Sequence, residues 1–287
     1  MSNIYFLGFY TEGSEIDGGY DLTGDVQQIK DKISPYFKDM FIFSKRDLKK
    51  IPGSDLFCND YEEELDKNPN ANKIGYFDFK PFLIKYVLDI IPENSILLYH
   101  DINFSKIPPY WHTDWENIEN IAEFVLKNNN SDFFAKIEHG GAFVKNFVKS
   151  YTVRSMFNEE ESDIVYNCKL INAAQIFFRN SNLSKGFVSE WCKLCLRKDL
   201  IQKSPNENPH PEFQWNCGDQ DVLNCLIYRY VIDGKLNPDF PRYSFKYRVI
   251  RMENKPFDFP NQSWNPHPTG IEHIENTEII QYIKNRR

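Results

Sequence analysis

A carboxylate and an amide two positions apart, Asp101 and Asn103, follow an apolar run at residues 95–99. The run is expected to be a buried strand, and alternate residues of an extended segment point to the same side. Polar residues at the carboxyl end of such a strand lie where open α/β sheets bind their ligands. Asp101 and Asn103 could therefore share a hard cation such as Mg²⁺ or Mn²⁺; the plainer alternative is a turn after the strand. His100 is expected to point to the opposite face of the sheet.

A second group of oxygen-bearing side chains, Asp219, Gln220 and Asp221, stands at the start of the segment DQDVLN. Two carboxylates and an amide at a helix start suit a sugar-binding pocket. Either aspartate there could bind the hydroxyls of a sugar or accept a proton as a general base. The same residues would also stabilise a helix, because Asp219 could be its N-cap and Asp221 would complement the helix dipole, by about 0.5–1 kcal/mol each.

Lys80 lies in the segment FDFKP, directly before Pro81. Proline is favoured at the first position of a helix, so we expect a helix to begin there. A phosphate group at this helix start would meet both the Lys80 ammonium and backbone N–H groups. The alternative is an ordinary surface lysine.

Strand-like and helix-like patterns alternate along most of the chain. Strands are expected at residues 4–10, 40–44, 95–99, 132–138 and 170–179. Helices are expected at residues 26–37, 82–91, after a capping box at 113–116, around Trp191, from 219 onward and at 271–284. This alternation predicts an α/β fold whose sheet is mainly parallel and flanked by helices, in a single domain.

The bulk composition excludes several classes of protein. The 287 residues carry a net charge of −7, so a surface that binds nucleic acid is not expected. No apolar stretch approaches the roughly 20 residues that a transmembrane helix needs, and residues 1–13 are expected to contain a first strand rather than a signal peptide. The single CxxC pair, Cys192 and Cys195, cannot complete a four-ligand zinc site, and buried reduced thiols are expected. We therefore expect a soluble cytoplasmic protein.

The order of these motifs resembles that of the GT-A-fold glycosyltransferases. It is most similar to small polysaccharide-type enzymes of bacteria and large viruses, which share the pattern W-K-P, L-Y-x-D, Q, F-R-N and D-Q-x-x-L. In this chain the matching segments are FDFKP, ILLYHD, INAAQIFFRN and DQDVL, so the resemblance covers roughly residues 75–230. Asn103 departs from the second aspartate that is usual in the D-x-D element.

The resemblance implies a GT-A-like, Rossmann-like mixed but mainly parallel sheet. It implies one domain over residues 1–287, with a nucleotide-binding half up to about residue 105 and a half for sugar and acceptor from about residue 106. The substrates would be a nucleotide-sugar donor and a saccharide acceptor. The D-x-D-like element would hold Mn²⁺ or Mg²⁺ on the donor diphosphate through Asp101 and Asn103.

Further site residues follow from the same resemblance. Tyr10 and Thr11, at the end of the first strand, would contact the nucleotide base. From their size alone, Asn172 and Ala173, which begin the INAAQ strand, could let the substrate approach; the plainer alternative is that small residues in a buried strand serve packing. His267 would be a late histidine ligand of the metal, with packing on Trp264 as the plainer alternative.

Two other classes of function remain open at this point. A metal-dependent phosphodiesterase or nuclease could use Asp101, Asp219 and Asp221 to hold two cations, although such sites usually have a denser set of carboxylates and histidines. A non-catalytic carbohydrate-binding protein could use exposed aromatic residues. A panel of nucleotides with and without Mn²⁺ would separate these alternatives from a glycosyltransferase.

Overall fold

The structure is a computed structural model of the chain. It describes residues 3–10, 23–57, 77–102, 115–137, 142–202, 209–214, 218–241, 243–245, 271–273 and 277–286. Three of the predicted site residues, Thr11, Asn103 and His267, lie outside the described residues.

The centre of the molecule is a mixed five-stranded sheet with the strand order β2-β1-β3-β5-β4. Its strands are β1 (Ile4–Tyr10), β2 (Asp39–Ser44), β3 (Ile96–His100), β4 (Phe133–Ile137) and β5 (Ile171–Arg179). β1 pairs in parallel with both β2 and β3, whereas β5 is antiparallel to its two neighbours, β3 and β4. The predicted α/β class with a mixed sheet is therefore confirmed, with β5 as its antiparallel strand.

The connections around β1 create a topological switch point. From β1 the chain passes through α1 (Thr23–Ile33) to β2 on one side. From β2 it passes through α4 (Phe79–Ile90) to β3 on the other side of β1. In α/β sheets, ligands bind outside the carboxyl ends of strands at such a point. Here the carboxyl end of β1 is Tyr10 and the carboxyl end of β3 is His100. Asp101 directly follows His100.

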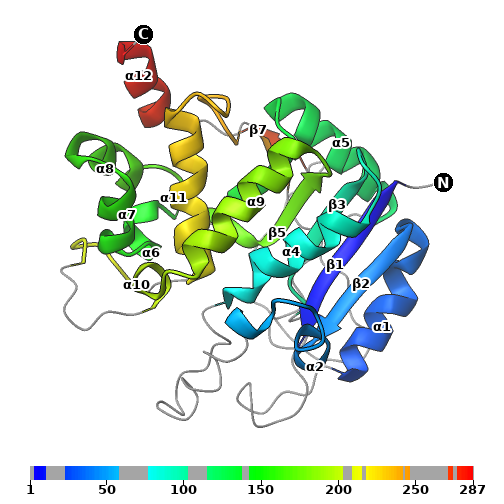
Figure 1. Cartoon of the computed structure of the whole chain (residues 1–287). Helices are drawn as coiled ribbons and strands as arrows, with labels where there is room; N and C mark the ends of the chain where they lie inside the picture. The colour runs from blue at the N-terminus through cyan, green and yellow to red at the C-terminus, as the bar shows by residue number, and fades with distance from the viewer. Residues whose placement is uncertain are drawn as a thin grey trace, which may run out of the picture.

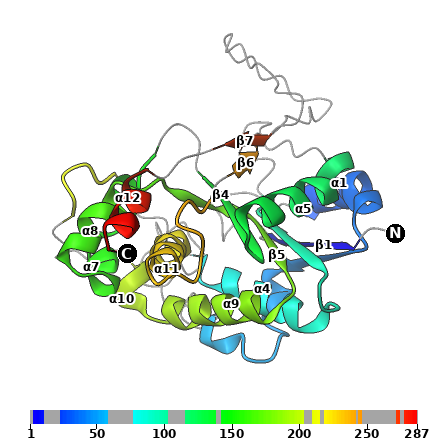
Figure 2. The ribbon, with the colours of Figure 1, turned by 90° about the horizontal axis from the view of Figure 1, so that it is seen from above.

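Helices cover both faces of the sheet, as Figure 2 shows. α4 and α9 (Asn182–Cys195) lie on one face, and α1 and α5 (Ile118–Asn129) lie on the other. Each strand contributes side chains to the cores on both faces, because successive side chains point to opposite sides of the sheet. In β1, for example, Tyr5 and Leu7 join the apolar core under α4 and α9, whereas Ile4 and Phe6 join the core under α1 and α5.

The core on the α4 and α9 face extends around a buried helix, α11 (Asp219–Ile232), to the C-terminal helix α12 (Thr277–Arg286). Figure 1 shows α11 between α9 and a group of shorter helices. These are α6 (Val144–Phe147), α7 (Ser150–Met156), α8 (Glu159–Tyr166) and α10 (Lys198–Ile201). The short helix α2 (Lys45–Leu48) follows β2. Among the described residues, no helix combines the length and apolar character needed to cross a membrane.

Several element boundaries differ from the sequence predictions. α4 begins at Phe79, so Pro81 is its third residue rather than its first, and the N-cap is Asp78. α11 begins at Asp219 itself, and the N-cap is Gly218 rather than Asp219. The predicted helix over 26–37 ends at Ile33, because Pro35 has no N–H for the helical bonding pattern and a 3-10 turn, η1 (Ser34–Tyr36), replaces it.

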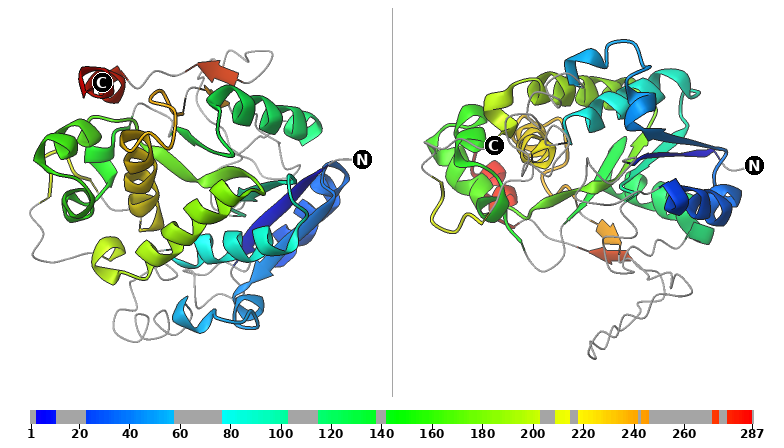
Figure 3. Two further views of the ribbon diagram at one scale, coloured as in Figure 1. Left: turned by 45° about the horizontal axis from the view of Figure 1, so that its top comes forward. Right: turned by 90° about the horizontal axis from the view of Figure 1, so that it is seen from below.

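The two remaining differences concern α5 and the C-terminal region. The first two residues of the predicted capping box, Thr113 and Asp114, lie outside the described residues. A 3-10 turn, η3 (Trp115–Asn117), leads into α5, whose N-cap Asn117 makes no side-chain capping bond. The predicted helix over 271–284 divides: β7 (Ile271–His273) pairs with β6 (Tyr243–Phe245), and α12 begins at Thr277. This small sheet lies beside α5 and β4 (Figure 3).

Candidate functional site

Lys80, in the first turn of α4, is the centre of a buried charged cluster. Its Nζ atom lies 3.6 Å from Asp101 Oδ1 and 3.3 Å from Asp219 Oδ2, and only 3% of the side chain is exposed. It also donates a 3.0 Å hydrogen bond to the carbonyl oxygen of Ala173. An ammonium group can be buried at this depth only when charged and polar partners compensate for lost hydration. The surface-lysine alternative is therefore wrong.

Asp101 is the accessible member of this cluster. Its backbone N–H donates a 2.9 Å hydrogen bond to Ala174 of β5, which fixes the chain just beyond β3. The Tyr99 hydroxyl donates a 2.7 Å hydrogen bond to Asp101 Oδ1, the same oxygen that faces Lys80. A quarter of the Asp101 side chain remains exposed. The carboxylate is thus held from the protein side and reaches solvent at the switch point.

The residues on either side of Asp101 anchor it to the opposite face of the sheet. His100 points to that face, as predicted, where its ring lies 5.7 Å from that of Trp115. Burial lowers the pKa of His100 to about 4, so its ring is neutral at pH 7. Ile102 is fully buried and packs over Gly8 of β1, where an added Cβ would lie 2.3 Å from Ile102 Cδ1. Gly8 therefore permits the close contact that holds this segment.

The start of α11 connects three neighbouring elements. Asp219 pairs with Lys80 of α4, and Gln220 Oε1 accepts a 2.9 Å hydrogen bond from the Ala173 N–H of β5. Asp221 Oδ2 accepts a 3.0 Å hydrogen bond from the Lys149 N–H, next to α7. Asn224, one turn later, binds both backbone groups of Ile171, at 2.7 and 2.9 Å. The polar residues of DQDVLN thus orient the elements around Asp101.

The role of Asn224 was not predicted, although the sequence contains a signal for it. The apolar residues of α11 occupy all sides of the helix, which is typical of a helix inside the core rather than on the surface. Polar side chains within such a helix must find hydrogen-bond partners. Asn224 could have been assigned a structural partner on this basis, but not the particular strand that it binds.

The cluster contains two carboxylates and one ammonium group, and its electrostatics follow from burial. Burial raises the pKa of Asp219 to about 7, and repulsion from Asp101 adds to this effect against the attraction of Lys80. For Lys80, burial acts to lower the pKa, but the attraction of Asp101 and Asp219 outweighs it and the pKa is raised. Burial and the neighbouring Asp101 also raise the pKa of Tyr99 well above its ordinary value.

Two charged residues of this cluster, Lys80 and Asp219, follow closely after residues with unusual backbone conformations. Phe77, three residues before Lys80, has φ of 65°, a value that bulky residues rarely adopt. Gly218, directly before Asp219, has φ of 65° and ψ of −112°, a conformation that favours glycine. The Lys80 ammonium lies 5.3 Å from the centre of the Phe77 ring and 5.2 Å from that of Tyr99. Strain of this kind concentrates at functional sites and persists where the surrounding structure enforces it.

The structure also locates the other predicted binding residues that it describes. Ala173 joins the cluster through its backbone, which contacts both Lys80 and Gln220. Asn172 is buried, and its Oδ1 atom accepts a hydrogen bond of 2.6 Å from the Ala174 N–H. Tyr10 ends β1 at the switch point, but its half-buried ring packs on the α1 and α5 face, away from the cluster.

Within the cluster of Lys80, Asp101 and Asp219, the accessible carboxylate that could bind a cation is that of Asp101. Among the described residues, no three histidine, cysteine or acidic side chains come together as a metal-binding group. The chemistry of Asp101 fits a hard cation, because its oxygen atoms are the donors that Mg²⁺ and Mn²⁺ prefer. The other two predicted ligands, Asn103 and His267, lie outside the described residues, so the predicted ligand set stays a prediction.

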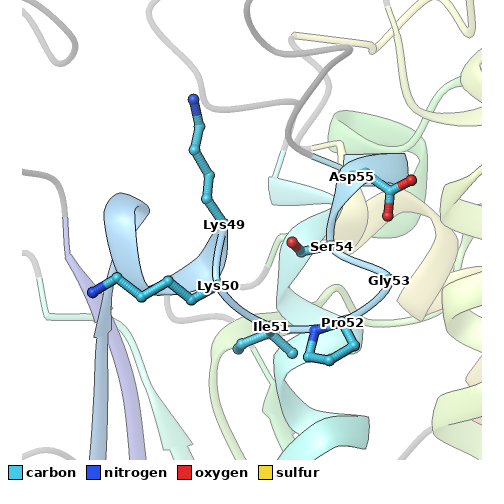
Figure 4. A pocket seen from close by; sticks show the side chains of 7 residues that line it. All are labelled: Lys49, Lys50, Ile51, Pro52, Gly53, Ser54 and Asp55. Atoms are coloured by element: carbon cyan, nitrogen blue, oxygen red, sulfur yellow. The ribbon is translucent and has the colours of Figure 1, made fainter.

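Two other features of the molecule take no part in the ion pairs of this cluster. Cys192 and Cys195 are buried in α9, as predicted. Burial raises the pKa of Cys192 to about 12 and raises that of Cys195 well above its ordinary value, which disfavours thiolate chemistry. A pocket of about 410 Å³ is lined by residues 49–55, beside α2. Its two lysine side chains, Lys49 and Lys50, point in different directions (Figure 4), so the pocket lacks convergent polar groups.

Comparisons with known proteins add no further assignment. No model of a known protein family matches the sequence, and no curated protein matches it. The residues and their geometry are therefore the basis for the function proposed below.

Proposed function

We propose that the protein is a glycosyltransferase that moves a sugar from a nucleotide-diphosphate sugar to a hydroxyl group of a saccharide acceptor. One observation carries this proposal: the motifs that gave the resemblance, though far apart in sequence, meet in a single cluster. Lys80 of FDFKP contacts Asp101 of ILLYHD, Ala173 of INAAQ and Asp219 of DQDVL. The cluster lies at the carboxyl end of β3, at the switch point where α/β sheets bind ligands.

In the proposed reaction the acceptor oxygen bonds to the anomeric carbon of the sugar while the bond from that carbon to the diphosphate oxygen breaks. The acceptor hydroxyl passes its proton to a general base or to water, and the nucleoside diphosphate leaves with increased negative charge. A divalent cation, when bound, supplies Lewis-acid stabilisation of this leaving group. Asp101, with Asn103 and His267 as the other predicted ligands, would hold it.

The protein's own residues prepare Asp101 for this role. Tyr99 and Lys80 both occupy its Oδ1 side, while a quarter of the side chain faces solvent. Groups that are fixed before the reaction stabilise developing charge without reorganisation, and a single such donor contributes about 3–4 kcal/mol in known enzymes. We therefore assign Asp101 to the substrate side of the cluster, and Lys80 to its support.

The predicted acid–base role of Asp219 and Asp221 stays a prediction. Asp219 has 2% of its side chain exposed and Asp221 is fully buried. A general base must come within hydrogen-bond reach of the proton that it removes. Their present contacts, with Lys80 and with the Lys149 N–H, support a role in holding the site.

The phosphodiesterase alternative receives less support from this geometry. A two-cation site would need Asp101, Asp219 and Asp221 to converge on shared metal ions. Instead, an ammonium group lies between Asp101 and Asp219, and the carboxylate of Asp221 is directed to the Lys149 backbone. We therefore keep the glycosyltransferase as the proposal.

A thermal-shift panel of nucleoside diphosphates, with and without Mn²⁺, tests this proposal. We expect one diphosphate to stabilise the protein only when the cation is present, by about 2.7 kcal/mol at one hundred times its dissociation constant. Asp101→Asn should abolish this stabilisation. The matched control is Asp89→Asn, which alters an exposed carboxylate on α4 that pairs with Lys85. Absence of a response to every diphosphate, or an unchanged response in Asp101→Asn, would contradict the proposal.

A further inference from the structure

Asp219 has almost no exposed surface with which to bind a substrate, yet it is connected to the accessible Asp101. The Asp219 carboxylate lies 3.3 Å from Lys80 Nζ, and the same ammonium lies 3.6 Å from Asp101 Oδ1. Only 2% of the Asp219 side chain is exposed, against 25% for Asp101. The three side chains therefore form a line from the buried start of α11 to the solvent-facing end of β3.

The ammonium in this line has few other ways to be held in place. Lys80 reaches the cluster from α4, and among the described residues its hydrogen-bond partner besides the two carboxylates is the Ala173 carbonyl oxygen, at 3.0 Å. The backbone of Asp219 is itself fixed, because Trp191 Nε1 donates a 3.2 Å hydrogen bond to the Asp219 carbonyl and Gly218 sets the entry of the chain. A carboxylate on such a rigid support determines where the ammonium rests.

We propose that Asp219 is a positioning residue for Asp101: through Lys80 it fixes Oδ1 on the protein side, so that the other oxygen, Oδ2, is presented to the ligand. This inference rests on the proposed function only for the identity of the ligand. Asp219, when it is ionised, draws the ammonium inward, and the ammonium and the Tyr99 hydroxyl both lie on the Oδ1 side of Asp101. Without that charge, Lys80 is free to move toward Asp101, and the direction of the Asp101 carboxylate changes.

The other charged groups near Asp219, Lys80 and Asp101 are consistent with a role of Asp219 in placing Lys80. Asp78, at the N-cap of α4, is a third nearby carboxylate, but its Oδ2 atom pairs with Lys198 at 3.0 Å. Asp78 also contributes to the raised pKa of Asp219. Lys80 is thus the cation shared by Asp101 and Asp219, and a neutral residue at 219 changes the charge that acts on it.

The test uses the full-length protein labelled with ¹³C at aspartate carboxyl carbons. The Asp101 resonance is assigned as the one that Asp101→Asn removes, and Mn²⁺ alone is the ligand probe. In Asp219→Asn we expect the Asp101 resonance to shift. We also expect Mn²⁺ affinity to fall ten- to a hundredfold, the usual effect of removing a group that orients a metal ligand. The control Glu161→Gln neutralises another buried carboxylate, which pairs with Arg229 at 3.0 Å, and should change neither property.

The outcomes separate this inference from the proposed function. If the Asp101 resonance is unchanged in a folded Asp219→Asn protein, the positioning role is wrong, whatever the metal does. If Mn²⁺ fails to broaden the Asp101 resonance of the unmodified protein, the proposed metal chemistry is wrong, while the shift still decides the positioning role. Should Asp219→Asn not fold, the charge-balanced pair Lys80→Met with Asp219→Asn takes its place, and an unshifted Asp101 resonance there overturns the inference.

Discussion

Asp101 and Asp219 are carboxylates that share one ammonium group, yet they lie in different surroundings. Asp101 follows a strand at the switch point and keeps 25% of its side chain exposed, whereas Asp219 starts a buried helix and keeps 2%. Burial raises the pKa of Asp219 to about 7. The difference indicates that accessibility, rather than residue type, distinguishes a carboxylate that can bind a ligand from a carboxylate that supports the binding residue.

The largest effect is expected when the shared cation is removed. Lys80→Met leaves two carboxylates without their counterion, and breaking a buried pair in this way costs about 3–5 kcal/mol. Urea denaturation should show this loss in the free energy of unfolding. The control Lys85→Met removes a pair whose side chains are 43% and 46% exposed, and should change stability by less than about 1 kcal/mol. Equal effects of the two substitutions would mean that the Lys80 cluster is no stronger than a surface pair.

The pH dependence of stability should distinguish Asp219 from ordinary carboxylates. Its pKa is raised from 3.8 to about 7 in the folded state, so the folded protein retains a proton that the unfolded chain releases. This group therefore makes folding less favourable as pH rises from about 4 to 7, by at most on the order of 4 kcal/mol.

Asp219→Asn removes this titration. The stability of the unmodified protein relative to Asp219→Asn should therefore fall between about pH 4 and pH 7, and stay constant above that range. Denaturation of both proteins at several pH values measures this difference. A relative stability that rises with pH over this range would show that the pKa of Asp219 is lowered by folding instead.

An intermediate effect is expected at the residue that leads into Asp219. Gly218→Ala places a side chain at φ of 65° and ψ of −112°, and residues held in such conformations cost about 1–3 kcal/mol. Gly186→Ala is the matched control. Gly186 lies in the interior of α9, and a Cβ added there would have no atom within 4 Å. That control should stabilise the protein by about 0.5–1 kcal/mol. Thermal unfolding measures both, and the same sign of change at the two positions would contradict the expectation.

The smallest effect is expected at the hydroxyl group that binds Asp101. Tyr99→Phe removes the 2.7 Å hydrogen bond to Oδ1 and should reduce stability by about 1 kcal/mol. Tyr230→Phe removes a comparable 2.8 Å bond to Glu190 and should cost a similar amount. Only Tyr99→Phe should also weaken the Mn²⁺-dependent binding of diphosphate. Equal weakening by both would remove Tyr99 from the support of Asp101.

Local sequence patterns determined much of the fold. The apolar run at residues 95–99 predicted β3 and the position of Asp101 at its end, and the alternation of side chains along a strand predicted the opposite direction of His100. These features depend on the two-residue period of a strand, which a single segment defines without knowledge of its neighbours. The helix boundaries were predicted less well where one residue changed the local geometry, as at Pro35 and Gly218.

Tertiary packing alone decided which polar residues meet. From the sequence, Lys80 could be a surface residue or a phosphate ligand, and only its tertiary contacts with β5 and α11 place it between two aspartates. Likewise, Asn224 binds Ile171 because a buried helix must pair its polar groups with whichever strand lies beside it. The sequence by itself determined which chemical groups are available at each position. Contacts between distant segments determined the surroundings of those groups, because burial and nearby charge depend on neighbours that no local pattern encodes.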